Sequence, residues 1–114
     1  MTLFEQLKLF PKIDLHVDFL GSVTKDTILK LTNNTLTYQE VEEALVLSSV
    51  TDYDNSRKNV ANLLNSLDSI EIATIDLLGK LKKDNIIYSE IFINLNYFSK
   101  TLNKKDILKT ILKI

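Results

Sequence analysis

The sequence contains no cysteine, and this absence removes two classes of site. Without thiols the chain can form neither a disulfide nor a thiolate metal centre, and it suits a reducing compartment. Histidine is almost as scarce, because His16 is the only imidazole in 114 residues. A metal site built by this chain alone therefore has no thiolate ligand and only one imidazole ligand to use.

Long apolar runs and a charge excess of one sign are also missing. No hydrophobic stretch approaches the roughly 20 residues that a membrane-spanning helix needs, and the first residues include no basic leader, so we expect neither membrane insertion nor secretion. The net charge of −1, with acids and bases mixed along the chain, predicts no nucleic-acid partner. With 45% hydrophobic and 25% charged residues, we expect a globular protein of the cytoplasm.

The hydrophobic pattern predicts two strands separated by helices. Residues 13–17 alternate between apolar and polar side chains, and residues 86–93 are rich in β-branched and aromatic ones, so both predict strands. Apolar residues spaced by three and four predict helices elsewhere, with a polar loop at residues 52–56 and a break within the longest pattern. The expected helices cover residues 3–9, 25–31, 57–83 and 107–114, with one more that begins at Thr37.

Two strands joined by a long helical crossover should be adjacent and parallel. The predicted fold class is therefore α/β, helix-rich, with two parallel strands. Parallel sheets normally contain more strands and bury both faces, so we interpret residues 1–114 as a single partial domain. Its open strand edges and apolar faces predict a partner, either a second copy or a chain that supplies further strands.

The candidate site lies where the first strand ends. His16 can bind a metal, Asp18 follows two positions later, and Gly21 breaks the strand. Histidine and aspartate are both zinc ligands. The alternative is that His16 is a strand-end residue with an ordinary hydrogen-bond partner, and that Asp18 caps or orients the loop.

The run from Pro11 to Ser22 resembles the first strand of the adenosine deaminase family, within the metal-dependent amidohydrolase superfamily. The segment from Asp84 to Glu90 is similar to the turn and second strand of that family. The resemblance implies the first third of a (β/α)8 TIM barrel. It also implies the family reaction, which is the zinc-dependent hydrolytic deamination of adenosine to inosine. The matching positions of the first motif are Pro11, Lys12, Asp14, Leu15, His16, Gly21 and Ser22.

The resemblance carries over only in part. His16 matches the first zinc-ligating histidine, whereas Asp18 replaces the second histidine and Leu20 replaces an aspartate that contacts the nucleoside sugar. Gly21 matches the glycine that lets the backbone approach the substrate. The other zinc ligands and all the acid–base groups of the family would lie beyond Ile114, so we expect no catalytic residue among these 114.

Two hypotheses follow for function. In the first, the chain is a truncated adenosine deaminase-like protein that does not deaminate a purine nucleoside on its own. Zinc is then the cofactor by resemblance, held through His16 and Asp18, although this chain alone is not expected to bind it. In the second, the chain is a non-catalytic interaction module that self-associates or docks onto a partner chain.

Overall fold

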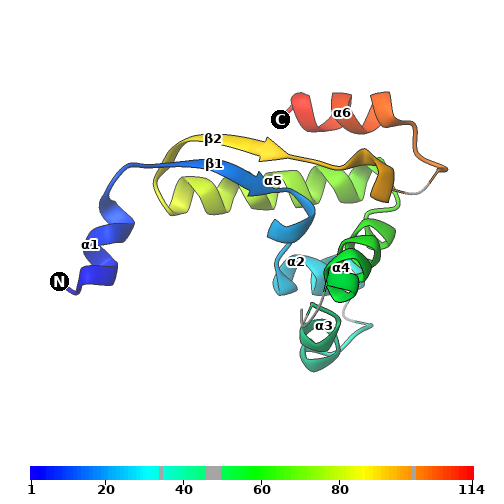
Figure 1. Cartoon of the computed structure of the whole chain (residues 1–114), viewed down its shortest axis with the longest axis horizontal. Coiled ribbons are helices and arrows are strands. Elements are labelled where there is room, and N and C mark those ends of the chain that lie inside the picture. The colour runs from blue at the N-terminus through cyan, green and yellow to red at the C-terminus, as the bar shows by residue number, and fades with distance from the viewer. Residues whose placement is uncertain (34, 46–49, 99) are drawn as a thin grey trace.

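The computed structural model describes residues 1–33, 35–45, 50–98 and 100–114. In this part of the chain, α5 runs along a short pair of strands, α1 projects beyond one end of the pair, and the other helices lie towards the opposite end (Figure 1). The short 3-10 turns η1 and η2 each follow a strand. The elements are, in order, α1 (Leu3–Leu9), β1 (Lys12–Asp18), η1 (Leu20–Ser22), α2 (Lys25–Leu31), α3 (Tyr38–Leu45), α4 (Val50–Leu63), α5 (Leu67–Lys83), β2 (Ile86–Phe92), η2 (Leu95–Tyr97) and α6 (Lys104–Leu112).

Strands β1 and β2 pair in parallel, which confirms the predicted fold class. Ile13 lies opposite Tyr88 and Val17 opposite Ile91. The crossover between the strands runs through the helices and returns along α5, which packs against β2 (Figure 1). Within the described residues the sheet contains only these two strands, so one edge of each strand has no strand beside it.

The hydrophobic core lies among the helices and not on the sheet. Of the two strands, only Val17 is buried, while Leu15 and Ile87 are 59% and 68% exposed. Much of the apolar surface of the strands therefore faces solvent. The buried apolar residues are Val17, Phe19, Leu20, Ile28, Val41, Val60, Ala61, Leu64, Ile70, Ala73, Leu77, Phe98 and Ile107.

Threonine side chains cap two of the predicted helices, the one at residues 25–31 and the one that begins at Thr37. The side chain of Thr24 accepts a hydrogen bond from the backbone N–H of Thr27. Thr37 and Glu40 exchange side-chain and backbone hydrogen bonds of 3.1 and 3.2 Å, which is a capping box. These side chains satisfy N–H groups that have no partner inside their own helix.

The predicted loop at residues 52–56 is wrong, because α4 begins at Val50 and includes it. Asp52 lies in the first turn of α4, where the helix dipole favours negative charge. The break expected within residues 57–83 is confirmed, since α4 ends at Leu63 and α5 begins at Leu67. None of the helices in the described ranges is both long and apolar enough to cross a membrane.

Candidate functional site

His16 lies on an exposed part of β1, beside the neighbouring strand. Its ring stacks on the ring of Phe92, with centroids 6.2 Å apart and planes at 18°. Its backbone N–H donates to Oδ1 of Asp14 over 3.1 Å. The imidazole is thus positioned by an aromatic contact across the sheet.

Asp18 ends β1 and is engaged with helix α4. Its Oδ2 accepts a hydrogen bond from Nε of Arg57 at 2.8 Å and another from the hydroxyl of Tyr53 at 3.2 Å. The side chains of Arg57 and Asp18 are only 13% and 26% exposed. Cζ of Arg57 also lies 4.3 Å from the centroid of the Tyr53 ring, a cation–π contact. Asp18 is therefore the anion of a partly buried ion pair.

Gly21 lies directly against this ion pair. A Cβ atom at this position would be 2.6 Å from Nη2 of Arg57 and 2.8 Å from Oδ2 of Asp18. The hydroxyl of Ser22 donates to the backbone oxygen of Asp18 over 2.6 Å and closes the turn. Leu20, which precedes Gly21, is 2% exposed and belongs to the core. The turn after β1 therefore contacts the Asp18–Arg57 ion pair through Gly21 and the hydrophobic core through Leu20.

The zinc ion implied by the resemblance does not fit the described residues. No group of three or more histidine, aspartate or glutamate side chains in the described ranges is placed to hold a metal ion. A catalytic zinc takes about three protein ligands and a water. His16 and Asp18 supply two at most, and Oδ2 of Asp18 is bonded to a guanidinium. No catalytic step through zinc is therefore derived for this chain.

Sequence reasoning missed Arg57 and Tyr53. Arg57 is the only arginine in the chain, and this rarity could have drawn attention to it in the sequence. Its partner Asp18 lies 39 positions earlier, however. The polar residues around Tyr53 predicted a loop, and only the helix α4 places both side chains over the end of β1.

A second polar link joins α4 to η2. The hydroxyl of Tyr97 donates to Oδ1 of Asp54 over 2.8 Å, and Nζ of Lys58 lies 2.9 Å from the other carboxylate oxygen. Hydrogen bonds from Lys58 first and Tyr97 second lower the pKa of Asp54 below its ordinary value of 3.8. The hydrogen bond to Asp54 raises the pKa of Tyr97 above 10.0. The link is therefore complete when the carboxylate is charged and the phenol is neutral.

Tyr97→Phe is expected to lower the urea midpoint of unfolding at pH 7. A lowered carboxylate pKa stabilises the fold above 3.8, and this contribution is lost as the pH falls through the folded pKa of Asp54. A raised phenol pKa stabilises it below 10.0, and this is lost at higher pH. The difference between the variant and the wild type should therefore shrink at both extremes. Tyr88→Phe, at a side chain 54% exposed, is the control and should change nothing; a pH-independent loss in Tyr97→Phe would contradict the assignment.

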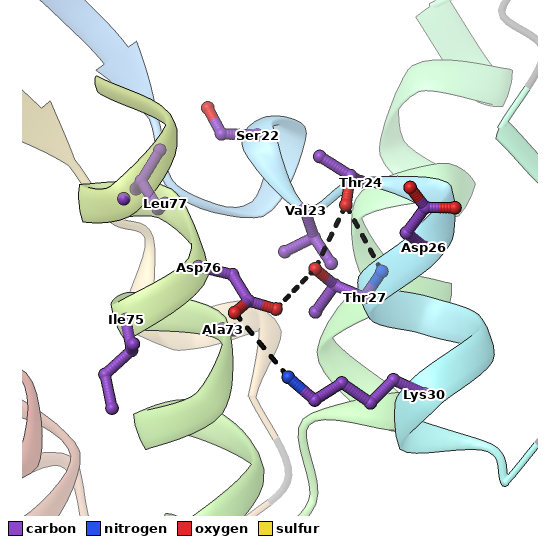
Figure 2. Close-up of a pocket in the computed structure, with 11 residues that line it drawn as sticks. Ser22, Val23, Thr24, Asp26, Thr27, Lys30, Ala73, Ile75, Asp76 and Leu77 are labelled. Atoms are coloured by element: carbon purple, nitrogen blue, oxygen red, sulfur yellow. Dashed lines mark hydrogen bonds and ion pairs between the residues drawn. The ribbon is translucent and has the colours of Figure 1, made fainter. Parts of the chain in front are cut away.

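A hollow lies elsewhere, between α2 and α5, with a volume of about 490 Å³. Figure 2 shows Asp76 of α5 pointing towards Thr27 and Lys30 of α2. The Thr27 hydroxyl donates to Oδ2 of Asp76 over 2.8 Å, and Nζ of Lys30 lies 3.7 Å from Oδ1. None of the three predicted site residues lines this hollow. The bonds of Asp76 to Thr27 and Lys30 join the two helices across it, so we interpret it as a helix–helix contact.

Comparisons with known proteins show that the chain is similar to deaminases. No protein-family profile matches the chain. The adenosine deaminase of Clostridium perfringens is 30% identical over 90% of this chain and 34% of that protein. The adenine deaminase of Crocosphaera subtropica is 33% identical over 82% of this chain and 29% of that protein. The chain thus spans about a third of the length of the curated relatives that it matches.

Solved structures share the fold of this chain. An ADAL–IMP complex superposes with a TM-score of 0.73 at 17% identity, over 96% of this chain and 34% of that one. The N6-methyl-AMP deaminase of Arabidopsis thaliana, in its apo form, gives a TM-score of 0.69 at 17% identity and the same coverage. The sequence and structure comparisons both cover about a third of the matched proteins. The chain therefore corresponds to the N-terminal part of the adenosine deaminase family.

Proposed function

We propose that residues 1–114 form a single partial domain, the first two strands and their helices of a (β/α)8 deaminase barrel, and that they do not deaminate a purine nucleoside by themselves. The observation that carries the proposal is the coverage. Nine-tenths of this chain aligns with a third of an adenosine deaminase. In the complete barrel the reaction would be the zinc-dependent hydrolytic deamination of adenosine to inosine.

The site residues support a partial role only. In a complete barrel, His16 is the residue we place on the metal side, and Gly21 is the residue we place beside the nucleoside. Asp18 is the second metal-side residue, on the condition that Arg57 releases it. Ligands from other strand ends would have to complete the centre, because a catalytic zinc needs about three.

One observation favours the alternative of a non-catalytic interaction module. In the part of the chain that the structure describes, the strands expose large apolar side chains and two unpaired edges, which are features that a partner usually covers. A chain that supplies the missing strands and a second copy of this chain would both bury this surface. We place either assembly in the cytoplasm, because a chain without cysteine forms no disulfide that would require an oxidising compartment.

The test measures the conversion of adenosine to inosine and the mass of any complex that the chain forms. The purified chain is incubated with adenosine, with and without zinc, and inosine is separated by chromatography. It is also mixed with a polypeptide carrying the remaining two thirds of the Clostridium perfringens adenosine deaminase, and the mass of the product is measured by light scattering. We expect no inosine from the chain alone and a one-to-one complex with the complementary polypeptide.

Three results would decide against this view. Zinc-dependent inosine formation by the chain alone, abolished in His16→Ala, would overturn the proposed lack of catalysis. A defined homo-oligomer that ignores the complementary polypeptide would favour the interaction module. A monomer that binds neither would remove both kinds of assembly.

A further inference from the structure

The end of β1 already holds a cation of its own. Arg57 brings a guanidinium to Oδ2 of Asp18, and both side chains are largely removed from solvent. Two features fix the guanidinium there. The ring of Tyr53 lies under it at 4.3 Å, and the missing side chain of Gly21 leaves the space that Nη2 occupies.

A guanidinium and a metal ion compete for the same carboxylate oxygen. A metal at Oδ2 would have to displace Nε of Arg57 from 2.8 Å and the Tyr53 hydroxyl from 3.2 Å. The released guanidinium would then stand beside a second cation in a partly buried place, where repulsion is weakly screened. An Arg–carboxylate pair with an aromatic support is also well organised before any metal arrives.

We propose that Arg57 is the resident cation of this chain at the end of β1, that it neutralises Asp18 in place of a metal ion, and that it fastens helix α4 to the turn after the strand. Arg57 is thus a positioning residue, and Gly21 is small in this chain to admit it. This inference goes beyond the proposed function. It concerns contacts within these 114 residues and describes the chain on its own, before any other strand joins it.

The first arm of the test measures coupling in a double-mutant cycle. Asp18→Asn, Arg57→Met and the double variant are unfolded with urea. Because both changes break the same pair, we expect the double variant to be at least tenfold more stable than additivity predicts, which is a coupling of about 1.4 kcal/mol. Lys58→Met is the matched control on α4, because its pair with Asp54 is exposed and it should show no coupling with Asp18→Asn. Additive losses at Asp18 and Arg57 would overturn the proposal.

The second arm measures zinc by competition with a chromogenic chelator, a readout that a purely structural pair would not change. We expect Asp18→Asn to leave the apparent zinc affinity of the wild type unchanged, because Asp18 is occupied. In the Arg57→Met background the same substitution should lower the affinity, because Asp18 is then free to ligate. An effect of Asp18→Asn in the wild type, or no effect in the Arg57→Met background, would overturn the proposal.

Arg57→Met could fail to fold, so a milder pair keeps the inference testable. Tyr53→Phe removes one hydroxyl from a side chain that is 43% exposed and leaves the ion pair in place. Its cycle with Asp18→Asn should show a coupling below tenfold, because the Tyr53 hydroxyl makes the longer of the two bonds to Asp18; additive losses would count against the proposal. Arg57→Lys keeps the positive charge and should keep the wild-type zinc behaviour; a gain of Asp18-dependent zinc binding in Arg57→Lys would contradict the proposed role of the cation.

Discussion

Ile70→Ala is expected to destabilise the chain by about 2–5 kcal/mol. Ile70 lies on α5 and is fully buried in the core between the helices. The substitution removes buried carbon atoms and leaves a cavity that the neighbouring side chains fill only in part. Domains of this size are stable by about 5–15 kcal/mol, so the loss should appear as a large drop in the urea midpoint measured by circular dichroism.

Ile75→Ala is the matched control on the same helix. Ile75 is 49% exposed, so its truncation removes less buried surface than that of Ile70 and should cost clearly less stability. Equal losses in the two variants would mean that both faces of α5 are covered, for instance by another copy of the chain. The comparison therefore tests whether the core lies where the structure places it.

Gly21→Ala is expected to destabilise the chain by about 1–3 kcal/mol through overpacking. Gly21 has a negative φ, so alanine can adopt its backbone conformation and only space is at issue. The new Cβ would lie 2.6 Å from Nη2 and 2.9 Å from Cζ of Arg57. The guanidinium must move away from Asp18 to admit it. Urea unfolding of the variant measures the loss.

Two further variants separate this cause from a general effect of alanine. Gly79→Ala meets nothing within 4 Å and lies inside α5, so it should stabilise the chain by about 0.5–1 kcal/mol. In an Arg57→Ala background, Gly21→Ala should cost much less, because the contacting atoms of Arg57 are gone and Asp18 can rotate. An undiminished loss in that background would show that Gly21 serves the turn alone.

The sequence predicted the order of elements well because that order depends on local patterns. The alternation at residues 13–17, the aromatic and β-branched run of β2, and the caps at Thr24 and Thr37 involve neighbours in the sequence. The parallel pairing followed from the length of the crossover. The prediction for residues 52–56 was wrong because polar and acidic residues are common both in loops and at the start of a helix. The sequence pattern did not show that a helix had already begun before residue 52.

The contacts of the candidate site could not be predicted. The motif around His16 pointed to the end of β1, and a functional role for that place stays a prediction. The partner of Asp18 came from a helix 39 positions away, a contact that neither spacing nor charge pattern indicates. The close approach at Gly21 was likewise expected to admit a substrate, whereas within this chain the space holds part of Arg57.

Helix α1 has a practical consequence for work with this molecule. It buries none of its own side chains and is tied to the rest by polar contacts, such as that from Nδ2 of Asn85 to the backbone oxygen of Leu9. A biotin or fluorophore attached to an outward position of α1 would leave the interior undisturbed. If the chain is immobilised on a biosensor surface through this helix, the outer edges of β1 and β2 should therefore stay accessible to a partner protein in solution.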